Sequence, residues 1–443
     1  MTITEAGADL RAGRTTCQEL TAAALRTVEE LNPKLNAFIT ITADAAIERA
    51  GQLDAELAAG HDRGPLHGIP IAHKDLIFTK GVRTTCGSKL FENFVPDYDA
   101  PAVARLAAAG AVSLGKLGLH ELAYGVTSTN PHFGPVRNPC NPECIPGGSS
   151  GGSGAAVAAG LVFMATGTDT GGSIRIPASY CGTVGFKPTY GLVDRSGVQP
   201  LAFSLDHVGP LTRTVRDAEL VLDVLAGPQA LPADRPIRIG LPANYFFDVI
   251  DPEVKAAVEA AARLCESLGF PVISVQVPDI DALNAAAFAI IMSEASAVYE
   301  SHLPRRDQFG ADVLALLDMG TLVPATAYVN AQRLRTRMGA EFRRLFESVD
   351  VLLTPTIPIV APRIGQLTVE LGGQTLQTRM VTTMFVRGFN VLGLPALSLP
   401  VGRSRSGMPI GAQLVGRAFE DSLVLKLGKA LEGAIHSERG KAA

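Results

Sequence analysis

Residues 146–153 read Pro-Gly-Gly-Ser-Ser-Gly-Gly-Ser, and residues 167–177 read Gly-Thr-Asp-Thr-Gly-Gly-Ser-Ile-Arg-Ile-Pro. Two glycine-rich loops that both contain serine thus lie on either side of an apolar segment. Glycine lets the backbone adopt positive φ angles and approach a ligand closely. Serine provides a nucleophile, and successive N–H groups in such loops can hold a developing oxyanion. The pattern indicates acyl-transfer chemistry.

Phosphate binding is the main alternative for glycine-rich loops. A P-loop requires Gly-Lys-Ser/Thr after its glycines, and a dinucleotide site requires Gly-x-Gly-x-x-Gly between a strand and a helix. Neither loop contains the lysine. Plain turns would explain one such loop, but they explain two serine-containing loops less well.

The loops resemble the signature of the amidase signature family of serine hydrolases. That family has a serine in the first loop, a nucleophilic serine 24 residues later, and a lysine about 75 residues before the first serine. Ser149, Ser173 and Lys74 match this order and spacing, which implies that Ser173 is the nucleophile. It also implies a cis peptide bond before Ser149. The resemblance is dense over residues 65–217, resumes at 389–402, and is weak between them.

The three residues also form a chemically sensible set. A serine hydroxyl is inert without a base. Lys74 can act as that base only when it is neutral; the pKa of an exposed lysine is about 10.4, and burial lowers it. Apolar neighbours on both sides of Lys74 favour such burial. Ser149 is then expected to relay the proton between Lys74 and Ser173.

Other residues of the loops are expected to support the reaction. Four consecutive backbone N–H groups can converge on one point as an oxyanion hole, those of Thr170, Gly171, Gly172 and Ser173. We expect Ser150 to be a supporting donor and Ser153 to cap a helix that begins near Gly154. Asp169 and Arg175 are expected to orient the nucleophile loop through an ion pair or hydrogen bonds.

A substrate pocket is expected beside the nucleophile. The resemblance places the segment 124–127 near the site, and Ile176 follows Arg175 in the second loop. The predicted lining residues are therefore Tyr124, Gly125, Val126, Thr127 and Ile176. Substrate preference is expected to lie mainly in the variable, helix-rich region 230–385, because loops on a rigid sheet commonly determine specificity.

A Ser-His-Asp triad is the commoner hydrolase arrangement. Residues 147–151 match the letters of the Gly-x-Ser-x-Gly elbow only weakly, because glycine and serine are common in such loops. His120-Glu121 has no second histidine at the spacing of a zinc site, and Cys140 and Cys144 have no second pair. We therefore predict no metal and no cofactor.

Composition favours a cytoplasmic enzyme. The net charge is −4 and charged residues make up 19%, so no basic face for nucleic acid and no polybasic membrane segment is predicted. The apolar stretches, such as 285–292, are too short to cross a bilayer, and the N-terminus has no signal-peptide pattern. A monomer or homodimer without nucleic-acid or membrane partners is expected.

Alternating helical and apolar periodicity predicts an α/β fold, with a central mixed, twisted β-sheet flanked by helices on both faces. The resemblance implies the same amidase-signature fold in a single domain, 1–443. The expected helices are 16–31, 42–59, 100–109, 154–160 and 252–268, with a helix-rich stretch over 280–347. The expected strands are 111–115, 163–167, 270–276, 351–356 and 396–400, and a strand that delivers Lys74.

The predicted function is a stand-alone amidohydrolase that cleaves linear carboxamide bonds of small molecules through an acyl-enzyme. Esters and carbamates (urethanes) are expected as further substrates. The alternative is the glutaminase-like A subunit of a tRNA-dependent amidotransferase complex. Three features favour the first interpretation: Ile176 where the A subunit has glutamine, a short C-terminal half, and the absence of a tyrosine-rich helix.

Overall fold

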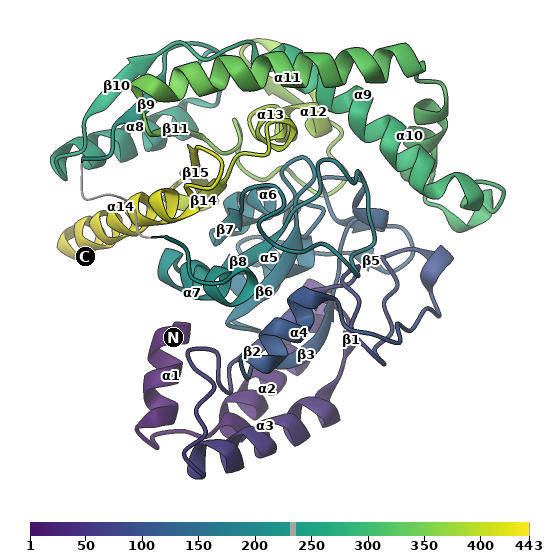
Figure 1. Ribbon diagram of the computed structural model, residues 1–443, viewed down its shortest axis with the longest axis vertical. Helices are drawn as coiled ribbons and strands as arrows, with labels where there is room; N and C mark the ends of the chain where they lie inside the picture. The colour runs from purple at the N-terminus through teal and green to yellow at the C-terminus, as the bar shows by residue number, and fades with distance from the viewer. Residues whose placement is uncertain (231–235, 443) are drawn as a thin grey trace.

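The computed structural model describes residues 1–230 and 236–442, and its centre is a mixed sheet of eleven strands (Figure 1). In spatial order the strands are β1 (Phe38–Ile41), β3 (Val112–Leu117), β2 (Pro70–Lys74), β6 (Met164–Thr168), β8 (Val208–Thr212), β7 (Val184–Lys187), β14 (Ala396–Arg403), β15 (Pro409–Gly416), β11 (Val351–Pro355), β9 (Ile239–Pro242) and β10 (Val272–Val275). Two small sheets pair β4 (Thr129–Asn130) with β5 (Gly134–Pro135) and β12 (Thr368–Leu371) with β13 (Gln374–Gln377). The predicted strands are confirmed, with boundaries that differ by up to three residues.

The directions of the strands place two chain segments at one edge of the sheet. β2 is parallel to β3 and to β6, whereas the strands from β8 to β15 pair in antiparallel fashion. All five residues of β2 and of β6 are buried, as expected for parallel strands that are covered on both faces. Because Lys74 and Thr168 are the last residues of β2 and β6, both strands deliver their C-terminal residues to the same edge.

Helices cover both faces of this sheet, as predicted (Figure 1). α5 and α6 pack against β6, β7 and β14, and α7, α8 and α14 pack against β8, β14 and β15. The helices are α1 (Ile3–Arg11), α2 (Cys17–Leu35), α3 (Ala43–Ala58), α4 (Pro101–Ala108), α5 (Gly151–Ala158), α6 (Arg175–Cys181), α7 (Val215–Ala226), α8 (Pro252–Ser267), α9 (Ile280–Tyr299), α10 (Ala311–Thr321), α11 (Ala325–Ser348), α12 (Thr378–Thr383), α13 (Arg387–Val391) and α14 (Asp421–Ala442). Short 3-10 turns are η1 (Lys89–Phe91), η2 (Glu121–Ala123), η3 (Glu300–His302) and η4 (Arg306–Gln308).

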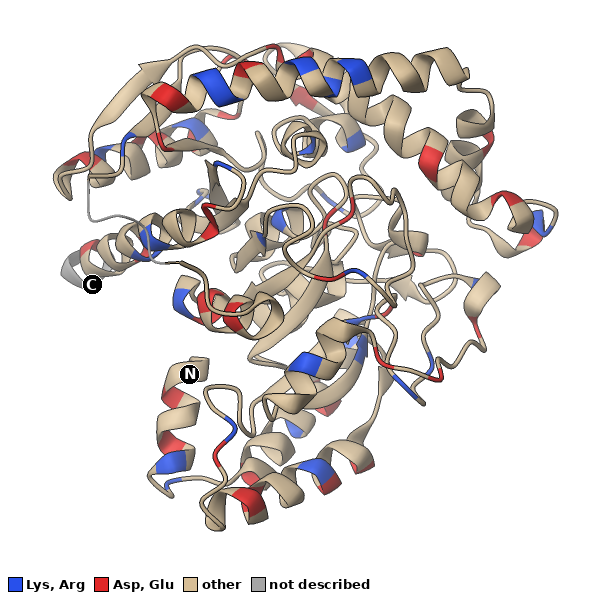
Figure 2. Cartoon of the chain, viewed as in Figure 1, with Lys and Arg blue, Asp and Glu red and all other residues tan. Residues whose placement is uncertain are grey.

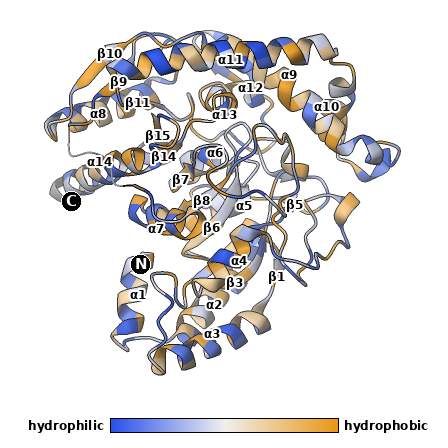
Figure 3. Ribbon diagram, in the orientation of Figure 1, coloured by the Kyte–Doolittle hydropathy of each residue, from blue (hydrophilic) through white to orange (hydrophobic). Residues whose placement is uncertain are grey.

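Local sequence signals explain several helix starts. Thr16 accepts a hydrogen bond from the Glu19 N–H, and the Glu19 side chain accepts one from the Thr16 N–H, which is a capping box for α2. Asp251 caps α8, whose first residue is Pro252. The outer helices α3 and α11 alternate hydrophilic and hydrophobic residues along their length (Figure 3). The predicted helices 16–31, 42–59, 100–109 and 252–268 are confirmed within a few residues.

The start of α5 differs from the prediction. The helix begins at Gly151, three residues early, and Ser153 lies inside it. The Ser153 hydroxyl donates to the Thr166 carbonyl at 2.9 Å and does not cap the helix. The residue before the helix, Ser150, makes no capping bond either. Close packing requires glycine in the first turn, because a methyl group on Gly152 would lie 2.4 Å from the Gly118 carbonyl oxygen.

The region 280–347 is helix-rich, as predicted, and contains α9, α10 and α11. By length and composition, the helical stretch Ile280–His302 is long and apolar enough to cross a membrane. The apolar run 285–292, the part of this stretch that the prediction from sequence considered, is too short to do so. Here α9 packs against α10, α11 and α13. Its Glu294 is buried and accepts hydrogen bonds from Ser204 and Tyr328. α9 is thus a core helix of this fold. The division into one domain with a variable region stays a prediction.

Candidate active site

Lys74 lies at the C-terminal end of β2 with no solvent exposure. Its Nζ donates to Ser149 Oγ at 2.7 Å and to Thr168 Oγ1 at 2.8 Å. Burial lowers the pKa of Lys74 to about 7, although Asp169 and Asp206 act in the opposite direction. A large fraction of Lys74 is therefore neutral near pH 7, as a general base requires.

Ser149 and Ser150 directly precede α5. The Gly148–Ser149 peptide bond is cis, as the resemblance implied. The Ser149 carbonyl accepts from the His120 N–H at 3.1 Å and from Ser128 Oγ at 3.3 Å, which holds its backbone. Ser150 Oγ donates to the Thr168 carbonyl at 3.1 Å. Ser150 therefore ties the start of α5 to the end of β6, and its contact is structural.

Residues 169–174 connect β6 to α6, and we call them the nucleophile loop after the predicted role of Ser173. Ser173 is 6% exposed and lines a cavity, and the Ser150 N–H donates to its carbonyl. Within the described residues, the N–H groups of Thr170, Gly171 and Ser173 have no hydrogen-bond partner. In contrast, the Gly172 N–H donates to Asp169 Oδ1 at 2.7 Å. Gly172 therefore shapes the loop, and the other three N–H groups are available for an oxyanion.

Asp169 and Arg175 form a fully buried ion pair beneath this loop, with 3.0 Å between Arg175 Nη2 and Asp169 Oδ1. Burial alone would raise the pKa of Asp169, but the Arg175 charge and hydrogen bonds outweigh it and hold that pKa well below its usual range. Arg175 also donates to the Val386 carbonyl and to Gln413. The Asn390 side chain accepts from Arg175 and donates to Asp169. The pair thus connects the nucleophile loop to the C-terminal strands.

Asp169→Asn should lower the free energy of unfolding by about 3–5 kcal/mol, because it leaves the Arg175 charge buried without a counter-charge. Urea denaturation followed by circular dichroism measures this change. Asp318→Asn is the matched control, since Asp318 pairs with Arg306 on the surface with both side chains about half exposed; an exposed pair is worth about 0–1 kcal/mol. Equal effects of the two substitutions would contradict a structural role for the buried pair.

Two connected cavities lie in front of Ser173. The inner one has a volume of about 40 Å³ and is lined by Tyr124, Gly125, Val126, Ser173 and other residues. The outer one has a volume of about 670 Å³, has a mainly apolar wall, and shares Val126 and Arg379 with the inner cavity. Thr127 lines the outer cavity. These four predicted pocket residues thus border the approach to Ser173.

Ile176 lies elsewhere. It is fully buried in an apolar cluster with Val126, Tyr180 and Val386, and a methyl group on Gly172 would approach its Cδ1 to 2.8 Å. Ile176 therefore packs beneath the nucleophile loop and does not line the cavities in front of it.

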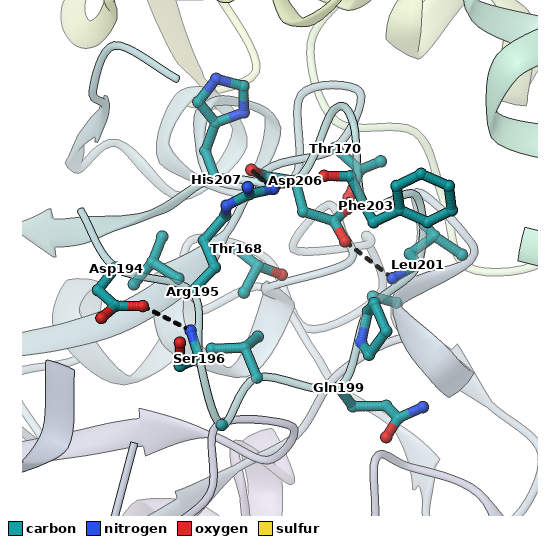
Figure 4. A pocket seen from close by; sticks show the side chains of 15 residues that line it. Thr168, Thr170, Asp194, Arg195, Ser196, Gln199, Leu201, Phe203, Asp206 and His207 are labelled. Atoms are coloured by element: carbon teal, nitrogen blue, oxygen red, sulfur yellow. Dashed lines mark hydrogen bonds between the residues drawn. The ribbon is translucent and has the colours of Figure 1, made fainter. Parts of the chain in front are cut away.

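A third cavity is lined by Thr168, Thr170 and much of the segment 194–208 (Figure 4). Its volume is about 410 Å³, and it shares Thr170 and Leu201 with the inner cavity. Thr168, the hydrogen-bond partner of Lys74, lines it together with Asp206. Through Thr168, Lys74 therefore lies close to this third cavity as well.

Three further residues of the site were not predicted: Thr168, Arg379 and Arg387. Arg379 and Arg387 line the inner cavity from α12 and α13. Their sequence distance from Ser173 hides this contact, although an arginine within the apolar run 384–392 is an unusual feature. Among the described residues, no group of three or more His, Cys, Asp or Glu side chains is placed to hold a metal ion.

The Amidase family model matches residues 19–425. The chain belongs to the amidase signature family. It is 40% identical over 474 aligned residues to the A subunit of the glutamyl-tRNA(Gln) amidotransferase of Geotalea daltonii, with 98% of this chain and 96% of the relative covered. A crystal structure of an amidase superimposes with a TM-score of 0.93 at 38% identity, covering 98% of this chain and 99% of the other. The corresponding A subunit from Thermotoga maritima gives a TM-score of 0.79 at 33% identity, covering 98% and 94%.

These relatives correct the predicted function. The fold and the chemistry on carbon–nitrogen bonds are those of the family, but the prediction of a stand-alone amidase rather than an amidotransferase A subunit is wrong. Several further relatives, each about 40% identical over nearly the whole chain, have the same name as the Geotalea protein. The prediction gave three local features, Ile176 among them, more weight than this likeness over the full length.

The predicted partners are corrected by the same finding. The relatives are named as one subunit of an enzyme that acts on glutamyl-tRNA(Gln), so a small-molecule enzyme without nucleic-acid partners is not supported. That prediction rested on the net charge of −4. Figure 2 shows Lys and Arg interspersed with Asp and Glu along the ribbon. Net charge describes only this chain, whereas a second subunit can provide the basic surface for RNA.

Proposed function

We propose that this chain is the glutamine-hydrolysing A subunit of a tRNA-dependent amidotransferase complex. It releases ammonia from the side-chain amide of glutamine, and a partner subunit transfers that ammonia to glutamyl-tRNA. The observation that carries the proposal is the 40% identity to the Geotalea daltonii protein over 98% of this chain. The geometry around Lys74, Ser149 and Ser173 supports the hydrolytic half of the reaction.

The residues have the following proposed roles. Neutral Lys74 accepts a proton through Ser149 from the Ser173 hydroxyl, whose oxygen attacks the amide carbon. The N–H groups of Thr170, Gly171 and Ser173 stabilise the oxyanion. The relayed proton then returns to the leaving nitrogen, the carbon–nitrogen bond breaks, and ammonia departs.

Water completes the cycle. It gives one proton to the Lys74–Ser149 relay and attacks the ester carbon of the acyl-enzyme, and the carbon–oxygen bond to Ser173 then breaks. Glutamate leaves, and the proton returns to the Ser173 oxygen. The apolar neighbourhood that lowers the pKa of Lys74 therefore serves both halves of the reaction.

Reconstitution tests this proposal. We expect the chain, added in place of the A subunit to the other subunits of the Geotalea daltonii enzyme, to convert glutamyl-tRNA(Gln) into glutaminyl-tRNA(Gln) when glutamine is supplied. The Ser173→Ala variant should fail with glutamine but succeed with free ammonia, because only ammonia production is lost. Failure of the wild type with glutamine, together with Ser173-dependent cleavage of other amides, would contradict the proposal.

Hydrolysis of esters and carbamates (urethanes) stays a prediction of side activity, because the same acyl-enzyme forms from an ester carbonyl. The cytoplasmic location also stays a prediction.

A further inference from the structure

Two arginines project into the inner cavity without a carboxylate partner. Arg387, the first residue of α13, is 5% exposed, and Arg379 lies in α12. Within the described residues, neither guanidinium has an acidic group within ion-pair distance. Arg387 donates to Thr383 Oγ1 and stacks over the Phe288 ring at 3.9 Å, and Arg379 lies 5.5 Å from the centre of the Tyr124 ring.

Tyr124 adds an unused hydroxyl to the same cavity. It is 3% exposed, and its hydroxyl has no hydrogen-bond partner among the described residues. Burial raises the pKa of Tyr124 to about 12, while Arg379 and Arg387 act to lower it. A buried hydroxyl without a partner is costly, which indicates that a ligand atom completes it.

These groups lie beside the reacting atoms. A methyl group on Gly171 would lie 3.6 Å from Arg387 Cγ and 3.8 Å from Arg387 Nε. Arg175 donates to the carbonyl of Val386, the residue before Arg387, so the ion pair beneath the nucleophile loop also holds the backbone at the start of α13. Arg387 is therefore held next to the candidate oxyanion hole.

Electrostatics indicates the missing partner. Two neighbouring cations without a paired carboxylate destabilise a buried site. The Asp312 charge acts to raise the pKa of Arg379, but among the described residues it forms no ion pair with either arginine. Burial and the Arg379 charge lower the pKa of Arg387 to about 9, which is unusual for a guanidinium. A carboxylate matches the planar fork of arginine in two-point hydrogen bonds.

We propose that Arg387, Arg379 and the Tyr124 hydroxyl bind a free carboxylate of the substrate. The substrate class is then the monoamide of a short dicarboxylic acid. This inference rests on the proposed function, since glutamine is one such monoamide, and it adds that recognition is through the carboxylate alone. Among the described residues that line the inner cavity, no acidic side chain is present to pair with an ammonium group. Asp312, in the outer cavity, already bonds to His120 at 3.0 Å.

Four amides of equal reach separate these features. Glutaramate is glutamine without its amino group. Pentanamide has a methyl group in place of the carboxylate, and 5-aminopentanamide has a protonated aminomethyl group there. We expect kcat/KM for glutaramate to equal or exceed that for glutamine. We also expect kcat/KM for glutaramate to exceed kcat/KM for pentanamide and for 5-aminopentanamide at least about tenfold. One charge-assisted hydrogen bond contributes a difference of this size.

Variants then assign the effect to the arginine. Arg387→Leu should lower kcat/KM for glutaramate about 10- to 100-fold, mainly through KM, and should change that for pentanamide less than about threefold. Arg387→Lys should restore part of the loss, because it keeps the charge. Arg213→Leu is the matched control, since Arg213 is also shielded from water by burial, stacks over Phe163, and lies at the opposite end of β8 from the nucleophile loop; it should leave the preference intact.

The outcomes distinguish this inference from the proposed function. Cleavage of glutaramate that depends on Arg387, with glutamine refused, would support the carboxylate site and overturn the glutamine reaction. Equal rates for glutaramate and pentanamide, or equal losses for both in Arg387→Leu, would overturn the carboxylate site alone. If no amide is cleaved, calorimetry on Ser173→Ala protein decides: glutaramate should bind, and Arg387→Leu in that protein should abolish binding. Absence of binding would overturn the inference.

Discussion

Ser173→Ala should lower kcat for glutamine hydrolysis about 10⁴-fold or more while the protein stays folded. The substitution removes the attacking oxygen, and the candidate oxyanion N–H groups alone leave only a small residual rate. Stability should change little, because the Ser173 hydroxyl makes no hydrogen bond within the described residues. A coupled assay for ammonia measures the rate, and thermal unfolding measures the stability.

Ser153→Ala is the matched control. Ser153 is also buried, near the same loops, but its hydroxyl bonds to the Thr166 carbonyl. We expect a loss of about 1 kcal/mol in stability and little change in kcat. If Ser173→Ala retained more than about 1% of the wild-type kcat, the nucleophile would have to be another residue.

Activity should rise with pH through about 7 and then level off. Only neutral Lys74 accepts a proton, and burial lowers its pKa to about 7. Below that value kcat/KM should fall about tenfold per pH unit as the protonated fraction grows. Lys74→Ala should lower kcat/KM about 10²–10⁴-fold at pH 7, the range for a general base. Lys74→Arg should be equally inactive, because arginine does not become neutral.

A second buried lysine allows the inflection to be assigned. Burial and the Arg175 charge also lower the pKa of Lys187 to about 7, and its Nζ lies 3.2 Å from His207 Nε2, away from Ser149. In Lys187→Met the inflection should remain near pH 7. An inflection that disappears in Lys187→Met would show that Lys74 is not the titrating group.

Much of the sheet was predictable because its strands are short apolar runs between turn residues. The strand that delivers Lys74, the strand that precedes the nucleophile loop and the helices with capping residues all lie close to their expected positions. Parallel pairing of β2 with β6 explains why residues 75 and more positions apart meet. Local pattern and family spacing therefore indicated the neighbourhood of the triad candidates.

Other features depend on contacts that spacing does not encode. The Gly172 N–H is used by Asp169, a bond visible only once the loop is folded. Arg387 reaches the nucleophile loop because the Arg175 network holds residue 386 against it. Ser153 lies inside α5, where its hydroxyl bonds to the Thr166 carbonyl of β6 and does not cap the helix. Each case involves residues from separate elements.

The functional prediction failed for a different reason. The residues of the triad candidates describe a reaction that every amide-cleaving relative can share, so they do not distinguish a single enzyme from one member of a complex. One of its three grounds was Ile176, which packs beneath the loop and does not line the cavities in front of Ser173. Similarity over the whole chain is the stronger guide here.

Mass spectrometry of the acid-quenched protein during turnover of glutamine shows whether an acyl-enzyme forms on Ser173. We expect the wild type to gain the mass of one γ-glutamyl group on the peptide that contains Ser173, and Ser173→Ala to gain none. Turnover without an adduct, or an adduct on a different residue, would show that Ser173 is not the nucleophile.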